Sequence, residues 1–292
     1  MGAFKGYFDE SGKDADPHNA VAFCGYVTTV DGWKAFETAW AKALADNGAP
    51  YLHMKELHDP KGPLAKFAGK NNQAACKKLL ADLIEVVATS GLTCAGSLIR
   101  LPDLKEFNAE YGMNLEALPL AMYATMGELH MIYPLDTLEL ICDRLDDAER
   151  IVATAVEYSA SFVRYNASEN MRWSSLKGQH SFRNVLPIQA ADFVAWEARK
   201  EHERKNAWWK EHKRGLKPTD WMLHQGMWLG QQGRAWPDHR RSFFELSSAV
   251  KVHAGVIDYD FLCTHHNDIR NRVWTMEGRR EFWRAALAKQ SS

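Results

Sequence analysis

Residues 3–30 read AFKGYFDESGKDADPHNAVAFCGYVTTV, and this stretch decides the fold. Residues 3–10 alternate as in a strand that ends in acidic side chains, and residues 20–30 are rich in the β-branched and aromatic residues of a second strand. The segment between them, SGKDADPHN, is typical of a turn. The stretch therefore predicts a pair of connected strands with Asp9 at the end of the first.

Helices and strands alternate along the chain after this pair. Asp31 is expected to cap a helix that ends near Gly48 and carries apolar residues at helical spacing: Trp33, Phe36, Trp40 and Leu44. Further helices are predicted over 72–90, 146–165 and 185–205, with a pair of helices over about 115–133, and further strands over 92–100, 137–143 and at an edge within 171–182. This order of elements predicts an α/β protein with a mixed sheet flanked by helices.

Three carboxylates are predicted to converge on one site. Asp9 and Asp143 each end a predicted strand, so the two side chains meet if those strands are neighbours in the sheet. Asp192 shares a helix face with Gln189 and Trp196, because spacings of three and seven residues bring them to one side. Carboxylates held together repel one another unless a cation neutralises them, and hard oxygen ligands favour Mg²⁺ or Mn²⁺.

Each of the three acids also has a purely structural interpretation. Asp9 precedes a turn sequence, Asp143 stands where a residue could cap the next helix, and Asp192 could face solvent from its helix. The combination of the three in one arrangement favours the metal site, since two ions bound there could activate water and stabilise the leaving oxygen in phosphodiester cleavage.

Composition limits the classes of function. The 292 residues carry a formal net charge of -1, so any contact with nucleic acid requires a local basic patch. Five cysteines are scattered through apolar segments, which is typical of reduced thiols in a cytoplasmic protein. No apolar run is long enough to span a bilayer, so no membrane association is expected.

The chain is predicted to divide at residue 205. Residues 1–204 form the α/β domain, and residues 205–292 form a mostly helical, Trp-rich extension packed on it. Basic residues surround tryptophans within 198–215 and again within 270–284, a pattern that can hold a phosphate backbone and stack bases. The other interpretation is a solvated helix face whose tryptophans dock onto the main domain.

The sequence lacks the motifs of several other enzyme classes. It contains no phosphate loop, dinucleotide fingerprint or hydrolase nucleophile elbow. A zinc site is not expected either, because the available residues do not have the spacing of a four-ligand set: His253, Cys263, His265 and His266.

Four segments together resemble the DUF3800 family: YFDESG at 7–12, AFCGYV at 22–27, LELICDR at 138–144 and LPIQAADFVAW at 186–196. The resemblance covers residues 4–200 and implies an RNase H-like fold with a nuclease-type acidic site. It implies that Asp9, Asp143 and Asp192 are metal ligands and that Glu56, in HMKEL, is a fourth. It also implies that Glu10 and Gln189 are neighbours of the site.

The resulting hypothesis is a metal-dependent nuclease or related phosphoryl-transfer enzyme acting on DNA or RNA. Asp9 would bridge two Mg²⁺ or Mn²⁺ ions, and Lys177 or His180 would contact the phosphate or shuttle a proton. One alternative is a non-catalytic module that binds nucleic acid or a protein on the same scaffold, and another is a hydrolase of a small nucleotide substrate. The sequence is compatible with a homo-oligomer as well as with a monomer.

Overall fold

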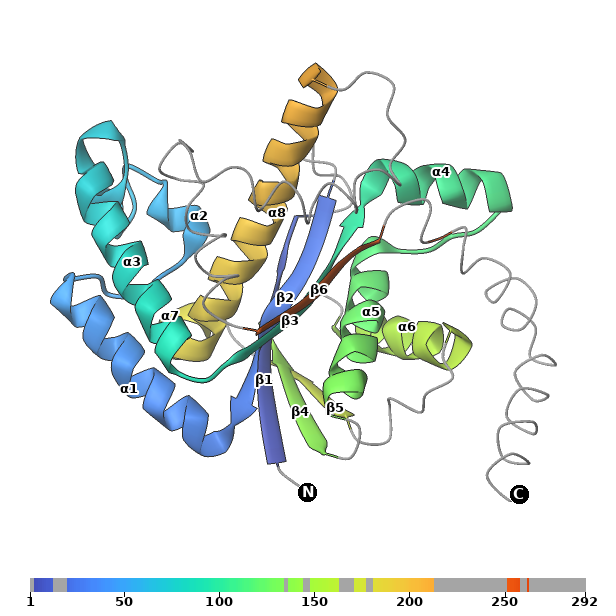
Figure 1. Ribbon diagram of the computed structural model, residues 1–292, viewed down its shortest axis with the longest axis horizontal. Helices are drawn as coiled ribbons and strands as arrows, with labels where there is room; N and C mark the ends of the chain where they lie inside the picture. The colour runs from blue at the N-terminus through green and yellow to red at the C-terminus, as the bar shows by residue number, and fades with distance from the viewer. Residues whose placement is uncertain are drawn as a thin grey trace.

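The computed structural model describes residues 3–12, 20–133, 136–143, 148–162, 171–176, 181–212, 251–257 and 262. The protein has an α/β architecture, in which a mixed sheet is flanked by helices on both faces (Figure 1). Within the described ranges, no helix is both long and apolar enough to cross a membrane.

The sheet has six strands in the order β5-β4-β1-β2-β3-β6. They are β1 (Ala3–Ser11), β2 (Ala20–Thr29), β3 (Thr93–Arg100), β4 (Thr137–Cys142), β5 (Met171–Ser175) and β6 (Lys251–Ile257). Strand β2 is antiparallel to β1 and to β3, whereas β4 is parallel to β1 and to β5, and β6 is parallel to β3. Because β1 and β4 are parallel neighbours, their carboxyl ends lie side by side at the same end of the sheet.

Eight α-helices are described: α1 (Val30–Asp46), α2 (Met54–Leu57), α3 (Gln73–Thr89), α4 (Leu101–Tyr111), α5 (Ala117–Ile132), α6 (Ala148–Phe162), α7 (Ser181–Asn184) and α8 (Leu186–His212). Helices α1, α3 and α8 lie on one side of the sheet, and α5 and α6 lie on the other (Figure 1). Helix α8 packs along β1 and β2. It begins within one residue of Pro187, as the sequence predicts.

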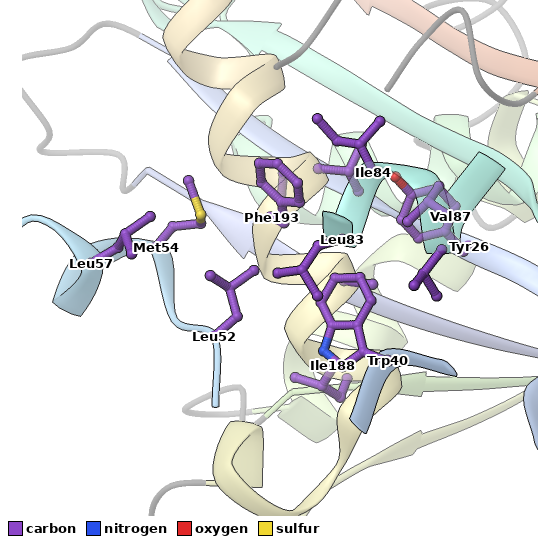
Figure 2. Packing of buried hydrophobic residues seen from close by; sticks show 14 of the residues in the cluster. Tyr26, Trp40, Leu52, Met54, Leu57, Leu83, Ile84, Val87, Ile188 and Phe193 are labelled. Carbon is purple, nitrogen blue, oxygen red and sulfur yellow. The ribbon is translucent and has the colours of Figure 1, made fainter. Parts of the chain in front are cut away.

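Side-chain alternation along the central strands divides the core into two clusters. Ala22, Cys24 and Tyr26 of β2 pack toward α1, α3 and α8. Phe23 and Val27 pack toward the other helices. Figure 2 shows part of the first cluster, where side chains of the chain segment before and within α2 lie beside those of α8: Leu52, Met54, Leu57, Ile188 and Phe193. The first cluster thus joins α8 to the segment that begins at residue 51.

The structure corrects the predicted start of α1. Thr29 is the N-cap, and its hydroxyl accepts a hydrogen bond from the Gly32 N–H at 3.1 Å. Asp31 lies in the first turn and pairs with Lys34 at 2.8 Å. Strand β2 continues directly into α1, so the last strand residue takes the capping position that Asp31 was expected to occupy.

Two other expectations need correction. Residues 117–132 form a single helix, and α4, which was not predicted, precedes it and ends at Gly112 in the left-handed conformation. In the range 205–292, which was expected to be mostly helical, residues 251–257 form an edge strand beside β3. Pairing with an existing strand satisfies the backbone of that segment, which its own sequence pattern did not indicate.

Candidate acidic site

Asp9 and Asp143 are brought together by the pairing of β1 with β4. The register places Phe8 beside Cys142, and the Asp143 N–H continues the ladder by donating to the Phe8 carbonyl oxygen at 3.1 Å. Phe8 is fully buried on one face of β1, so the alternating neighbour Asp9 belongs to the face covered by α8. This is the neighbouring-strand arrangement on which the predicted convergence depended.

Asp192 reaches the same place from α8. Its side chain is buried, at 9% exposure, so the interpretation as a solvent-facing helix residue was wrong. Its Oδ2 accepts a hydrogen bond from the backbone N–H of Met54 at 2.7 Å. The charges of Asp143 and Glu56 both act on the Asp192 carboxyl. The acids of α8, of α2 and of the end of β4 therefore belong to one site.

Side chains of α8 bind residues 52–58, the segment that carries Glu56. Gln189 Oε1 accepts hydrogen bonds from the Leu52 N–H at 2.9 Å and from the Trp40 indole N–H at 3.0 Å. Asp192 binds Met54 one turn further along the helix, and Trp196 stacks on His58 with ring centroids 5.9 Å apart. The three residues predicted to share a helix face therefore all contact residues 52–58.

Repulsion and burial raise the pKa of Asp9 well above its usual value. Loss of hydration is the largest cause, and the negative charges of Glu10, Asp192 and Asp143 add to it. A hydrogen bond from the Glu10 N–H to Asp9 Oδ1, at 2.8 Å, acts in the opposite direction. Glu10 lies beside the site, and its charge also contributes to raising the pKa of the Cys142 thiol.

The pKa of Asp192 is raised to about 6, again mainly by burial. Charges on Asp143 and Glu56 raise it further, while His53 and the Met54 hydrogen bond lower it. A carboxyl with a pKa near 6 is held in a place where its negative charge is unfavourable. Such perturbed acids are more common at functional sites than at ordinary structural positions.

The DESG sequence holds the end of β1 in place. Ser11 Oγ accepts a hydrogen bond from Nε of Arg199, at 2.9 Å, so α8 also contacts this strand beyond Asp9. Gly12 has a φ of +97°, and a Cβ atom built there would lie 2.3 Å from the backbone oxygen of Ala20. Only glycine suits this combination of backbone angle and close approach.

Glu56 lies in α2 among a tyrosine and two basic residues. The Tyr51 hydroxyl donates a hydrogen bond to Glu56 Oε2. His53 Nδ1 lies 3.6 Å from Glu56 Oε1, and Nη2 of Arg183 in α7 lies 3.9 Å from the same oxygen. The guanidinium of Arg183 lies over the Tyr51 ring, 5.1 Å from its centroid.

The donor set suits a hard divalent cation in its chemistry. Carboxylate oxygens are the preferred ligands of Mg²⁺ and Mn²⁺, and a cation would relieve the repulsion that raises the pKa of Asp9 and Asp192. In the part of the chain that the structure describes, no group of three or more His, Cys, Asp or Glu side chains already has the arrangement needed to hold a metal ion. The site has the right donors without a preassembled coordination shell.

Several predicted residues lie outside what the structure describes. Lys177 and His180, the expected phosphate contacts, are among them, as are Cys263, His265 and His266. Residues 213–215 of the first basic patch and all of the second patch, within 270–284, also lie outside the described residues.

Sequence reasoning did not single out Tyr51, His53 or Arg183. A signal for His53 was present in HMKEL, where its spacing of three residues from Glu56 places both on one side of a helical turn. No local pattern marks Arg183, which contacts Tyr51 and Glu56 across more than 120 residues of sequence.

Comparison of this chain with known protein families, with curated proteins and with solved structures found no match in any of the three.

Proposed function

We propose that this protein is a divalent-metal-dependent nuclease of the RNase H-like kind. In this proposal Asp9, Asp143, Asp192 and Glu56 hold Mg²⁺ or Mn²⁺ and cut a phosphodiester bond of DNA or RNA. The single observation that carries the proposal is geometric: Asp9 and Asp143 stand at the ends of the paired strands β1 and β4, and the buried Asp192 joins them from α8. Burial and mutual repulsion raise the pKa of Asp9 and Asp192, and a divalent cation bound between these acids would offset the repulsion.

The strand order supports the RNase H-like part of the proposal. The core order is β3-β2-β1-β4-β5, with β2 antiparallel to both neighbours and β4 and β5 parallel to β1. This sheet places Asp9 and Asp143 at the ends of adjacent parallel strands, which is the arrangement that the proposed RNase H-like metal site requires. In the segments that resemble DUF3800, the motif residues make contacts that build the proposed site: Asp9, Ser11, Gly12, Gln189 and Asp192.

The residues of the chain have separable roles in the proposed reaction. Bound divalent ions would supply a water of lowered pKa and would stabilise the leaving oxygen. Asp9 and Asp143 would provide negative charge from the ends of β1 and β4. Asp192 would provide it from α8, where the Met54 N–H orients its carboxylate. Gln189 does not need to contact substrate, because its amide oxygen positions the segment that carries Glu56.

The proposal includes DNA or RNA as the partner and a cytoplasmic location. The cysteines support the location. Cys24, Cys76, Cys94 and Cys142 are free of disulfide bonds, and burial raises the pKa of each thiol, which disfavours the reactive thiolate form. Free thiols of this kind are typical of proteins in a reducing compartment.

The test is cleavage of labelled single- and double-stranded DNA and RNA in Mg²⁺ or Mn²⁺. We expect cleavage by the wild type and a loss of at least about 100-fold in Asp9→Asn and in Asp143→Asn, because each variant removes a charged ligand. Glu139→Gln is the matched control, since Glu139 is an acid of β4 that pairs with Lys5 at 2.9 Å, away from the end of the strand.

The outcomes separate the competing functions. Metal-dependent cleavage that survives in both aspartate variants would contradict the proposed site. Binding of nucleic acid without any cleavage would favour the non-catalytic module, and hydrolysis of nucleotides alone would favour the small-substrate enzyme.

A further inference from the structure

Arg183 places a positive charge at the border of the acidic site. Its side chain is 40% exposed, whereas that of its neighbour Glu56 is 22% exposed. The charge of Glu56 acts on Asp192, which in turn shares its electrostatic surroundings with Asp9 and Asp143. A polyanionic substrate approaching this surface would be repelled by the acids and attracted by the guanidinium.

The guanidinium lies beside an aromatic ring and a carboxylate. It lies over the face of Tyr51, at 5.1 Å from the ring centroid. Its distance to Glu56, 3.9 Å, is longer than a charge-assisted hydrogen bond of about 2.7–2.9 Å. The planar fork of donors on a guanidinium suits a phosphate group, which could compete with Glu56 for it.

We propose that Arg183 binds a phosphate of a nucleic-acid strand at the acidic site, with Tyr51 supporting the guanidinium and Glu56 competing with the phosphate for it. The proposal rests on the nuclease function proposed above and names the residue that recognises the substrate backbone. It gives this role to Arg183 in α7, whereas the sequence suggested Lys177 or His180 for the phosphate contact.

The competition by Glu56 gives the proposal a signature that a structural role would not produce. Removing the cation with Arg183→Gln should weaken the binding of an oligonucleotide. Removing the neighbouring negative charge with Glu56→Gln should strengthen that binding when no divalent ion is present, because Glu56 then no longer competes with the phosphate for Arg183. The two substitutions, Arg183→Gln and Glu56→Gln, should therefore change oligonucleotide binding in opposite directions.

The experiment measures fluorescence anisotropy of labelled oligothymidylate and oligouridylate, each with EDTA and with Mn²⁺. We expect Arg183→Gln to weaken binding about ten-fold, as the loss of one charge-assisted phosphate contact does. Arg183→Lys should lose less, because it keeps the charge without the fork. Glu56→Gln should bind a few-fold more tightly than the wild type in EDTA.

Arg150→Gln is the matched control. Arg150 is 49% exposed, lies in α6 on the opposite face of the sheet, and binds Glu116 through two contacts of 2.7 and 2.8 Å. The Arg150→Gln substitution removes one positive charge, as Arg183→Gln does, from a side chain of similar exposure. An equal loss of binding in Arg150→Gln and Arg183→Gln would overturn the proposal, as would wild-type affinity in Arg183→Gln or a wild type that binds neither oligonucleotide.

Calorimetric titration with Mn²⁺ separates this proposal from the nuclease function. We expect the wild type and Arg183→Gln to bind Mn²⁺ equally, since Arg183 offers no ligand to a cation. If the wild type binds no Mn²⁺ and cleaves nothing, the nuclease function fails, while a specific loss of oligonucleotide binding in Arg183→Gln still supports the phosphate contact. Circular dichroism of each variant checks that the fold is retained.

Discussion

At Gly12 the backbone takes a conformation that residues with side chains rarely adopt. Its positive φ and the short distance from a built Cβ atom to the Ala20 oxygen act together, and Cδ of Arg199 would lie only 3.0 Å away. A side chain would therefore strain the backbone and also press on the start of β2. Because Gly12 follows Asp9 by three residues, the close approach fixes the acidic end of β1 against its neighbour.

We expect Gly12→Ala to lower the free energy of unfolding by more than the cost of a left-handed conformation alone, which is about 1–2 kcal/mol. The control is Gly112→Ala, because Gly112 has a φ of +62° and no atom lies within 4 Å of its built Cβ. Urea unfolding of both variants measures the difference. Equal destabilisation of the two variants would contradict a role for the contact with Ala20.

Among the elements, α8 has the largest share in building the site. In its first turns, residues 187–195 are all buried, because the sheet covers one side and residues 51–58 and α1 cover the other. Such burial requires partners for polar side chains, and Gln189 and Asp192 find them in the backbone of residues 52 and 54. The same hydrogen bonds that satisfy the helix therefore position Glu56.

Gln189→Met should reduce the free energy of unfolding by about 2–6 kcal/mol. Methionine has a similar size but leaves the Trp40 indole N–H and the Leu52 N–H without their acceptor, at about 1–3 kcal/mol each. Chemical denaturation measures the loss. Thr125→Val is the control, since its buried hydroxyl donates to the Ala121 carbonyl of its own helix and its removal leaves no buried donor unpaired. A loss in Gln189→Met no larger than in Thr125→Val would count against the positioning role.

For the molecule as a whole, we expect the acidic site to make stability depend on pH, and on cations if the proposed metal binding holds. The pKa of Asp192 is about 6 in the folded state and near 3.8 in the unfolded state, so the folded protein binds this proton more tightly. Its stabilising contribution is complete below pH 4 and is lost as the pH rises through 6. The loss is on the order of 3 kcal/mol, from 1.36 kcal/mol per pKa unit.

We therefore expect the wild type to lose stability relative to Asp192→Asn between pH 4.5 and pH 7.5 in EDTA. Asparagine keeps an acceptor for the Met54 N–H but does not titrate. At pH 7.5, Mg²⁺ should stabilise the wild type, by about 2.7 kcal/mol at 100 times its Kd, and should stabilise the variant less. Urea unfolding at each pH tests both points, and parallel pH profiles of the two proteins would exclude Asp192 as the group responsible.

The periodicity of single segments was enough to predict most elements of the fold. The strands that carry Asp9 and lead to Asp143 were predicted with nearly correct limits, because each has a strong local pattern of apolar residues. The helix that carries Asp192 begins where it was predicted but continues to residue 212, past the predicted end at 205. The periodicity did not predict three features: the cap at Thr29, the helix over 101–111 and the strand over 251–257. Their local signals are weak, and contacts made by neighbouring elements decide their conformation.

The sequence by itself determined which side chains carry charge and where each stands on its strand or helix. Asp9, Asp143 and Asp192 were recognisable from the ends of strands and the face of a helix. Only the tertiary structure decided that β1 pairs with β4, that α8 binds residues 52–54, and that Arg183 lies beside Tyr51 and Glu56. Local patterns reflect interactions between near neighbours, whereas the electrostatics of the site arise from groups that are distant in sequence and meet only when the sheet and α8 pack together.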